Sequence, residues 1–192
     1  MKDDFTRVLL ENCLDVEDLD INLNKLNFQF SSKPLLIGGK AKEYYHIRES
    51  GKDIDFVITQ EDYELLSYKY PNNVKEIYDD FGVCKYEFEM WKSICLFDYK
   101  FLSEEAIEKD EFLIISFEKL MFLKVLGMRQ PKYLKDLELI RDRIAEMNTL
   151  LHTSIDIKNI NVNTINKDNI PSANPKVKII LVKDFNVYMY SP

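Results

Sequence analysis

The sequence has few of the residues that mark the easily identified protein classes. Three cysteines in 192 residues, none in a CxxC pair, predict neither a disulfide framework nor a zinc site. No apolar run approaches the roughly 20 residues that cross a bilayer. The acidic, interrupted N-terminus is typical of neither a signal peptide nor a transit peptide. We therefore expect a cytoplasmic protein without a membrane partner.

Basic residues are also fewer than acidic residues. The chain has 26 Lys and Arg against 33 Asp and Glu, which gives a net charge of -7. Such a surface argues against broad, non-specific nucleic-acid binding but leaves room for a local basic groove. Hydrophobic residues make up 46% of the chain, enough to bury a core within one domain and a small appendage.

Hydrophobic periodicity and turn residues predict a chain of mixed helices and strands. Helices are predicted over 3–14, 60–69, 73–80, 103–110, 117–128 (with Ser116 as N-cap) and 132–148. Extended segments are predicted over 35–39, 53–59, 84–91, 93–102, 111–116, 177–184 and 186–190, with 84–91 and 93–102 pairing as a hairpin. The Asn-, Ser- and Pro-rich stretch after residue 150 is typical of a loop.

Three of the five glycines lie in one stretch, LLIGGKAKEYYHIRESGKDIDFVI, at 35–58. A strand that ends in Gly38 and Gly39 and turns into a short helix exposes backbone N–H groups, which suit phosphate oxygens. Asp53 and Asp55 follow at i and i+2 of a predicted strand, so both carboxylates point to one face. Two such carboxylates can share a pair of Mg²⁺ ions, an arrangement that supports phosphoryl or nucleotidyl transfer.

The order Ile-Gly-Gly, thirteen residues, then Asp-Ile-Asp-Phe resembles the signature of the nucleotidyltransferase superfamily, the fold of DNA polymerase β. Arg48 and Ser50 make it similar to small bacterial nucleotidyltransferases, including the abortive-infection toxin type. The resemblance implies an α+β fold with a mixed β-sheet flanked by helices and a helical C-terminal extension. It implies a nucleotidyltransferase-like core over 1–112, a helical segment packed on the core over 113–150, and an irregular tail with terminal strands over 151–192.

The resemblance also implies a third carboxylate, on a later strand beside the strand of Asp53 and Asp55. Asp98 is the preferred match, because it is a solitary acid in the apolar strand ICLFDYK. Glu87 and Glu89 remain rivals on the preceding strand, whose even alternation favours an edge strand exposed on one side. Asp53, Asp55 and Asp98 are then expected to be both the catalytic and the metal-binding residues, with two Mg²⁺ ions.

Further residues are expected to bind a nucleoside triphosphate, with ATP favoured. The nucleotide-binding candidates are Gly38, Gly39, Lys40, Arg48, Ser50 and Lys135. Lys135 belongs to a KDL element that resembles one found after the core in toxin-type enzymes. Solvation of Lys40, a salt bridge of Arg48 and a turn role for Ser50 are the structural alternatives. Lys119 and Lys124, on a helix that is apolar on nearly every side, are interpreted as snorkelling lysines.

These expectations imply a Mg²⁺-dependent enzyme that moves a nucleoside monophosphate from a nucleoside triphosphate to a hydroxyl acceptor and releases pyrophosphate. The acceptor classes are protein, small molecule and tRNA, and the acidic pI of about 5.0 favours the first two. The toxin-type resemblance adds an antitoxin as partner. The alternative is a catalytically inactive nucleotide-binding or interaction module on the same fold. If the resemblance is accidental, Asp53 and Asp55 do not converge with Asp98 on one cleft.

Overall fold

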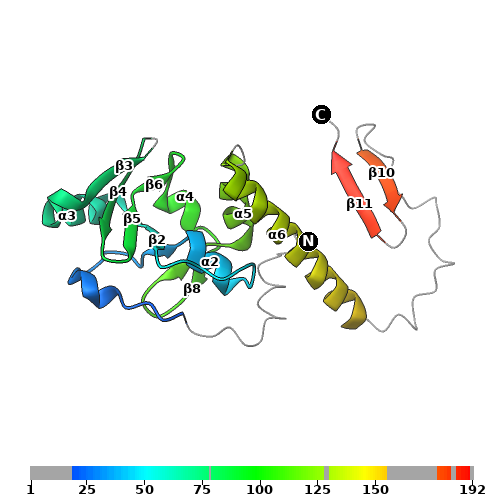
Figure 1. Ribbon diagram of the computed structural model, residues 1–192, viewed down its shortest axis with the longest axis horizontal. Coiled ribbons are helices and arrows are strands. Elements are labelled where there is room, and N and C mark those ends of the chain that lie inside the picture. Colours follow the sequence, from blue (N-terminus) through cyan, green and yellow to red (C-terminus); the bar gives the residue numbers. More distant parts are fainter. Residues whose placement is uncertain (1–18, 78, 128–129, 155–176, 183–184, 191–192) are drawn as a thin grey trace. The chain divides into compact units, whose positions relative to one another are not determined.

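The structure is a computed structural model that describes residues 19–77, 79–127, 130–154, 177–182 and 185–190. The chain divides into two units, Met1–Leu150 and Leu151–Pro192. The first unit is a mixed α and β protein whose seven-stranded sheet is flanked by helices (Figure 1). The helix predicted over 3–14 and most of the predicted tail loop lie outside the described residues.

The sheet contains both parallel and antiparallel neighbours. Its strands are β1 (Leu35–Leu36), β2 (Ile54–Val57), β3 (Val74–Ile77), β4 (Asp80–Lys85), β5 (Phe88–Trp91), β8 (Ile107–Glu108) and β9 (Leu113–Ile114). Their order is β3-β4-β5-β2-β1-β9-β8. The β2–β5 and β1–β9 pairs are parallel, and the other pairs are antiparallel.

Helices and one short hairpin complete the first unit. The α-helices are α2 (Gly38–Tyr44), α3 (Gln60–Lys69), α4 (Tyr99–Ser103), α5 (Phe117–Leu126) and α6 (Pro131–Ser154). Two 3₁₀ turns, η1 (Leu23–Leu26) and η2 (Pro71–Asn73), precede β1 and β3. The hairpin pairs β6 (Ser93–Ile94) with β7 (Phe97–Asp98). No helix in the described ranges is long and apolar enough to span a membrane.

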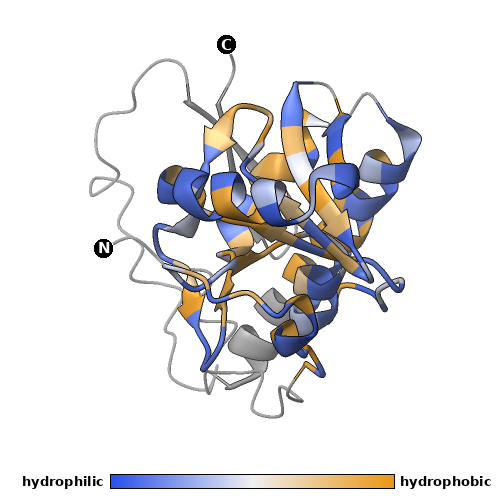
Figure 2. Ribbon diagram, turned by 90° about the vertical axis from the view of Figure 1, so that its left-hand side faces the viewer, coloured by the Kyte–Doolittle hydropathy of each residue, from blue (hydrophilic) through white to orange (hydrophobic). Residues whose placement is uncertain are grey.

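The central strands carry much of the core. Phe56 on β2 lies opposite Met90 on β5 and Leu36 on β1, and all three side chains are fully buried. Apolar residues concentrate on the central strands, whereas hydrophilic residues dominate the surrounding helices and turns (Figure 2). Because successive residues of a strand point to opposite faces, Asp55 lies on the other face of the sheet from Phe56.

Elements with a strong local signal lie where the sequence predicted them. α3 covers the predicted 60–69, and the Thr59 side chain accepts a hydrogen bond from the Asp62 N–H at 3.1 Å. α5 follows the predicted N-cap Ser116, whose hydroxyl oxygen accepts from the Lys119 N–H at 3.4 Å. The short helix predicted behind the glycine pair is α2, but it begins at Gly38 itself, so the extended segment predicted over 35–39 ends at Leu36 in β1. These three predictions are confirmed, because a capping side chain or a glycine pair acts within a few residues.

Two predicted helices are strands. The helix predicted over 73–80 is wrong, because Val74–Ile77 forms β3 and Asp79, at φ 66°, reverses the chain into β4. The helix predicted over 103–110 is wrong as well, because α4 ends at Ser103 and Ile107–Glu108 pairs with β9 as β8. In both places a hairpin between strands that lie close together in the sequence overrides a weak helical spacing.

The predicted hairpin of 84–91 with 93–102 is also wrong. The chain turns at Tyr86, which has φ 56°, so that β4 pairs with β5. Residues 93–102 instead form the β6–β7 hairpin and the start of α4. β5 lies between β4 and β2 and is therefore not the edge strand that its alternation indicated. The edge strand on this side is β3, whose four residues are all exposed.

The second unit contains one described hairpin. β10 (Val177–Val182) and β11 (Phe185–Tyr190) pair antiparallel, with Val177 opposite Tyr190 and Val182 opposite Phe185. The two terminal strands predicted from the sequence are therefore present.

Candidate active site

The turn into α2 brings the backbone against Asp55. Gly38 adopts φ +66°, and a Cβ atom at this position would lie 1.9 Å from the Asp55 Oδ2. Only glycine allows both this conformation and this approach. The Ile37 N–H donates to the Asp55 carbonyl oxygen at 2.9 Å, and the Gly39 N–H donates to the Asp55 carboxylate. The glycine pair thus holds the carboxylate of Asp55 directly.

Three carboxylates converge beside this turn. Glu89 on β5 lies in register with Asp55 on the parallel neighbour β2, and the two carboxyl groups are close enough to shift each other's pKa. Asp53 precedes Asp55 by two residues, and its negative charge raises the pKa of both partners. Burial raises the pKa of Asp55 and of Glu89 first, and the charge of Asp55 further raises that of Glu89. Asp53 itself is exposed.

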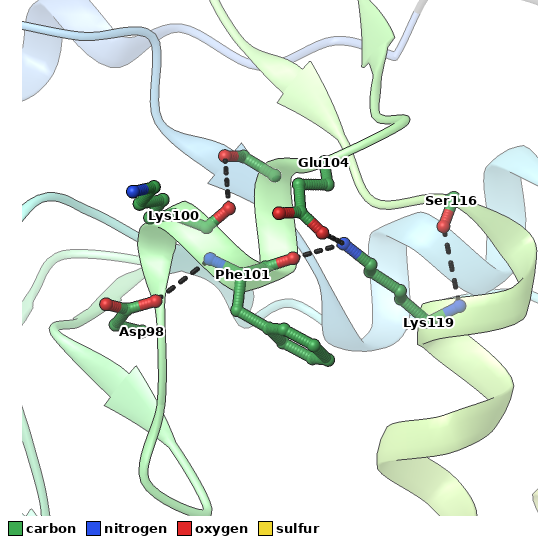
Figure 3. Close-up of polar contacts among 7 residues, drawn as sticks. Asp98, Lys100, Phe101, Glu104, Ser116 and Lys119 are labelled. Carbon is green, nitrogen blue, oxygen red and sulfur yellow. Dashed lines mark hydrogen bonds and ion pairs between the residues drawn. The ribbon is translucent and has the colours of Figure 1, made fainter.

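Asp98 has a different place from the one expected. It ends β7 in the separate two-stranded sheet, and its carboxylate accepts the Phe101 N–H at 2.9 Å as the N-cap of α4 (Figure 3). It is therefore not on a strand beside β2, because a turn at Cys95 and Leu96 breaks the expected long strand. Glu89, one of the two rivals, occupies that position. Glu87, the other rival, pairs with Lys25.

The three carboxylates have the chemistry of a site for a hard cation. No group of three or more His, Cys, Asp and Glu side chains in the described ranges has the geometry of a metal site. The donor set of Asp53, Asp55 and Glu89 nevertheless fits Mg²⁺, because all three offer carboxylate oxygens. Burial raises the pKa of Asp55 and of Glu89, and the charges of the neighbouring carboxylates raise both values further. A bound divalent cation would stabilise the ionised forms.

A buried ion-pair network joins α2 to α6. The Lys42 Nζ lies 2.6 Å from the Asp136 Oδ2, and the Arg48 Nε lies 3.0 Å from the Asp136 Oδ1. Burial opposes ionisation of Asp136, but hydrogen bonds from Lys42 and Arg48 hold its pKa below the usual value. Arg48 is therefore in a salt bridge, with 42% of its side chain exposed. Lys135, the expected ligand in the same KDL element, is exposed on α6.

Lys124 on α5 is a second, half-buried cation near the carboxylates. Burial and then the charge of Lys42 lower the pKa of Lys124 to about 8, against the opposing effect of Asp136 and Asp55. Its ammonium group lies 4.7 Å from the ring centroid of Tyr133. Lys124 is thus close enough to Asp55 to interact with it electrostatically, and its side chain does not simply extend to solvent.

The expected phosphate ligands Lys40 and Ser50 share one partner. The Lys40 Nζ lies 2.8 Å from a Glu43 carboxylate oxygen, and the Ser50 hydroxyl donates to the same oxygen. These bonds, first from Lys40 and then from Ser50, lower the pKa of Glu43. A Cβ atom on Gly39 would lie 3.4 Å from the Ser50 Cβ, so Ser50 lies beside the glycine pair.

Sequence reasoning missed or undervalued four of these residues: Glu89, Asp136, Lys42 and Lys124. Glu89 was a rival candidate for the third carboxylate. The alternation of polar and apolar residues along its strand was a signal that could have identified it. Asp136 belongs to the KDL element, in which only Lys135 was a candidate ligand. Lys42 and Lys124 carried no local signal, because an inward-pointing lysine on a helix is identified only when its partner is known.

Comparisons with protein-family models, with curated proteins and with solved structures find no match to this chain. The fold and the geometry of this site are therefore the basis for assigning a function.

Proposed function

We propose that the protein is a Mg²⁺-dependent nucleotidyltransferase on a nucleotidyltransferase-like fold. The observation that carries the proposal is the approach of the Gly38 backbone to Asp55, which itself lies in register with Glu89. This relationship brings a glycine turn, two carboxylates on adjacent strands and the nearby Asp53 into one small volume. A packed core requires neither the glycine nor the accumulated negative charge.

The cations around the carboxylates bind the phosphate oxygens of a nucleoside triphosphate. Lys124 lies near Asp55, and the half-exposed Arg48 is held by Asp136 at a fixed position. A guanidinium and an ammonium group both bind phosphate oxygens through charge-assisted hydrogen bonds. Lys40 and Ser50 lie beside Gly39 and can exchange Glu43 for a phosphate oxygen.

Glu89 is the group that receives the proton. Its pKa is raised by burial and by Asp55, so its carboxylate is a better proton acceptor than an exposed glutamate. The acceptor hydroxyl oxygen bonds to the α-phosphorus while the bond to the bridging oxygen breaks, and pyrophosphate leaves. The hydroxyl proton passes to a Glu89 carboxylate oxygen. Mg²⁺ held by Asp53, Asp55 and Glu89 would stabilise charge on the attacking and leaving oxygens.

The test is transfer of label from nucleoside triphosphates labelled at the α-phosphate. The purified full chain is incubated with Mg²⁺, each of the four nucleotides in turn and a cell extract as acceptor source. We expect label in one extract component, release of pyrophosphate and no transfer in the presence of a chelator. Asp53→Asn and Asp55→Asn should each reduce transfer by about 100-fold or more.

Two outcomes contradict the proposal. Transfer that survives in both aspartate variants would remove their assigned role. Absence of transfer with all four nucleotides, together with nucleotide binding by the same sample, would favour the inactive nucleotide-binding module. In that case the affinity should be insensitive to Glu89→Gln, because a binding module needs no proton acceptor.

A further inference from the structure

The face of the sheet that carries the carboxylates continues past them to the exposed edge. Register places Asp55, Glu89 and Cys84 in one row across β2, β5 and β4, because directly paired residues share a face. Lys75 on β3 lies opposite Gly82, which is two residues from Cys84 on β4, so Lys75 belongs to the same face. The row therefore ends in a lysine at the sheet edge.

Lys75 is an accessible cation at the end of an acidic row. β3 is exposed at all four residues. The Lys75 ammonium group is close enough to lower the pKa of the Cys84 thiol and of Glu89, although burial keeps both values raised. Lys75 has no ion pair within 4.0 Å among the described residues. The Cys84 thiol is a side-chain hydrogen-bond partner of Lys75, but a thiol does not neutralise the ammonium charge, which is available to a ligand.

The geometry of in-line displacement determines on which side of the α-phosphorus the acceptor lies. The glycine turn, Lys42 of α2 and Lys124 of α5 lie around Asp55, so the triphosphate belongs on that side. The attacking hydroxyl must approach the α-phosphorus from the side opposite the leaving pyrophosphate. That side is the one occupied by Glu89, Cys84 and Lys75. The acceptor therefore crosses β5 and β4 towards β3.

We propose that Lys75 is an acceptor-recognition residue that binds a phosphate group of the acceptor while the acceptor hydroxyl lies at Glu89. This inference rests on the proposed function and adds the chemical class of the second substrate. β5 and β3 are two strand spacings, about 10 Å, apart, and Lys75 is offset from Glu89 by two residues, about 7 Å, along the strand. The acceptor is thus a hydroxyl compound with a phosphate about 12 Å from the reacting oxygen. A nucleotide has this arrangement, either free or at the end of an RNA chain.

The experiment uses the label-transfer reaction with three variants. Lys75→Glu reverses the charge, Lys75→Arg retains it, and Lys85→Glu makes the same charge change on the neighbouring strand. Lys85 is a matched control because it points to the other face, over the rings of Tyr70 and Tyr86. We expect Lys75→Glu to raise the KM for the acceptor fraction about tenfold or more, as loss of one charge-assisted contact does. Its affinity for the nucleotide should stay unchanged, and Lys75→Arg and Lys85→Glu should behave as wild type.

Pretreatment of the extract identifies the source of the phosphate. Phosphatase treatment should abolish labelling if the acceptor is a phosphomonoester, and nuclease treatment should abolish it if the acceptor is RNA. Labelling that survives both treatments, as for a hydroxyl of a protein, overturns the inference. A wild-type KM for the acceptor in Lys75→Glu also overturns the inference. A change in kcat and its pH profile alone overturns it as well, because that result would mean that Lys75 acts by tuning Glu89. Absence of transfer by the wild type overturns the proposed function itself, and this inference with it.

Discussion

Gly38 and Asp55 approach so closely that the protein has no room for any side chain at position 38. A Cβ atom there would lie 1.9 Å from the Asp55 Oδ2, and the φ of +66° is itself costly for other residues. The relationship joins a turn to a carboxylate on the adjacent strand. The site therefore requires glycine at position 38.

Gly38→Ala should displace Asp55 and destabilise the protein. We expect the free energy of unfolding to fall by at least about 1–2 kcal/mol from the backbone conformation alone. Gly39→Ala is the matched control, because its Cβ would meet the Ser50 Cβ at an ordinary 3.4 Å. Thermal unfolding and nucleotide titration of both variants provide the measurement. Equal behaviour of the two variants would show that Asp55 does not depend on the approach of Gly38.

Asp55→Asn should abolish transfer and yet stabilise the fold at neutral pH. Burial raises the pKa of Asp55, so the fold favours its neutral form. The contribution of this carboxyl group to stability is present at low pH and is lost as the pH rises through the raised pKa. At pH 7 the neutral Asn avoids this loss, and we expect the Tm to rise by about 2–4 °C, or about 1 kcal/mol.

The matched control is Asp53→Asn, which removes an exposed carboxylate. Its Tm should stay close to that of the wild type. The gain of Asp55→Asn should shrink as the pH of the unfolding experiment is lowered, because the wild-type carboxyl group then takes up a proton as well. A lower Tm for Asp55→Asn at pH 7 would contradict this account.

Glu89→Gln and Asp98→Asn should separate the two candidates for the third carboxylate. Glu89 lies in register with Asp55, whereas Asp98 caps α4, a role that Asn performs equally well. We expect Glu89→Gln to lower the transfer rate by about 100-fold or more, and Asp98→Asn to leave both the rate and the Tm unchanged. The reverse result would return Asp98 to the reaction and require a rearrangement of the β6–β7 hairpin.

Nucleotide affinity should fall as the pH rises through about 8, because Lys124 then loses its charge. The charged groups around it are Lys42 of α2, Asp55 of β2, and Asp136 and Lys132 of α6. With a pKa of about 8, the Lys124 side chain is mostly protonated at pH 7 and mostly neutral at pH 9. We expect a decrease of about tenfold in affinity between these values, the effect of one charge-assisted hydrogen bond.

Two variants test the assignment of this pH dependence to Lys124. Lys124→Arg stays charged throughout and should flatten the profile, whereas Lys124→Gln should bind weakly at both pH values. Isothermal titration with each variant in the absence of acceptor gives the comparison. A pH dependence that persists in Lys124→Arg would belong to another group.

The sequence by itself determined the local elements of this protein. Thr59 and Ser116 begin α3 and α5 because a capping side chain bonds to an N–H three residues away. The glycine pair and the alternation of Asp53 and Asp55 are equally local, and they identified one side of the candidate site. Such signals operate within a few residues and need no knowledge of the rest of the chain.

Only the tertiary structure decided which residues meet. The pairing of β5 with β2 brings Glu89 to Asp55, and it depends on strand order, which no local pattern contains. Lys42 and Asp136 form an ion pair across 94 positions of the chain. Contacts between distant residues choose strand neighbours and buried charge partners, because their free energy arises from pairing and burial that neither segment has alone.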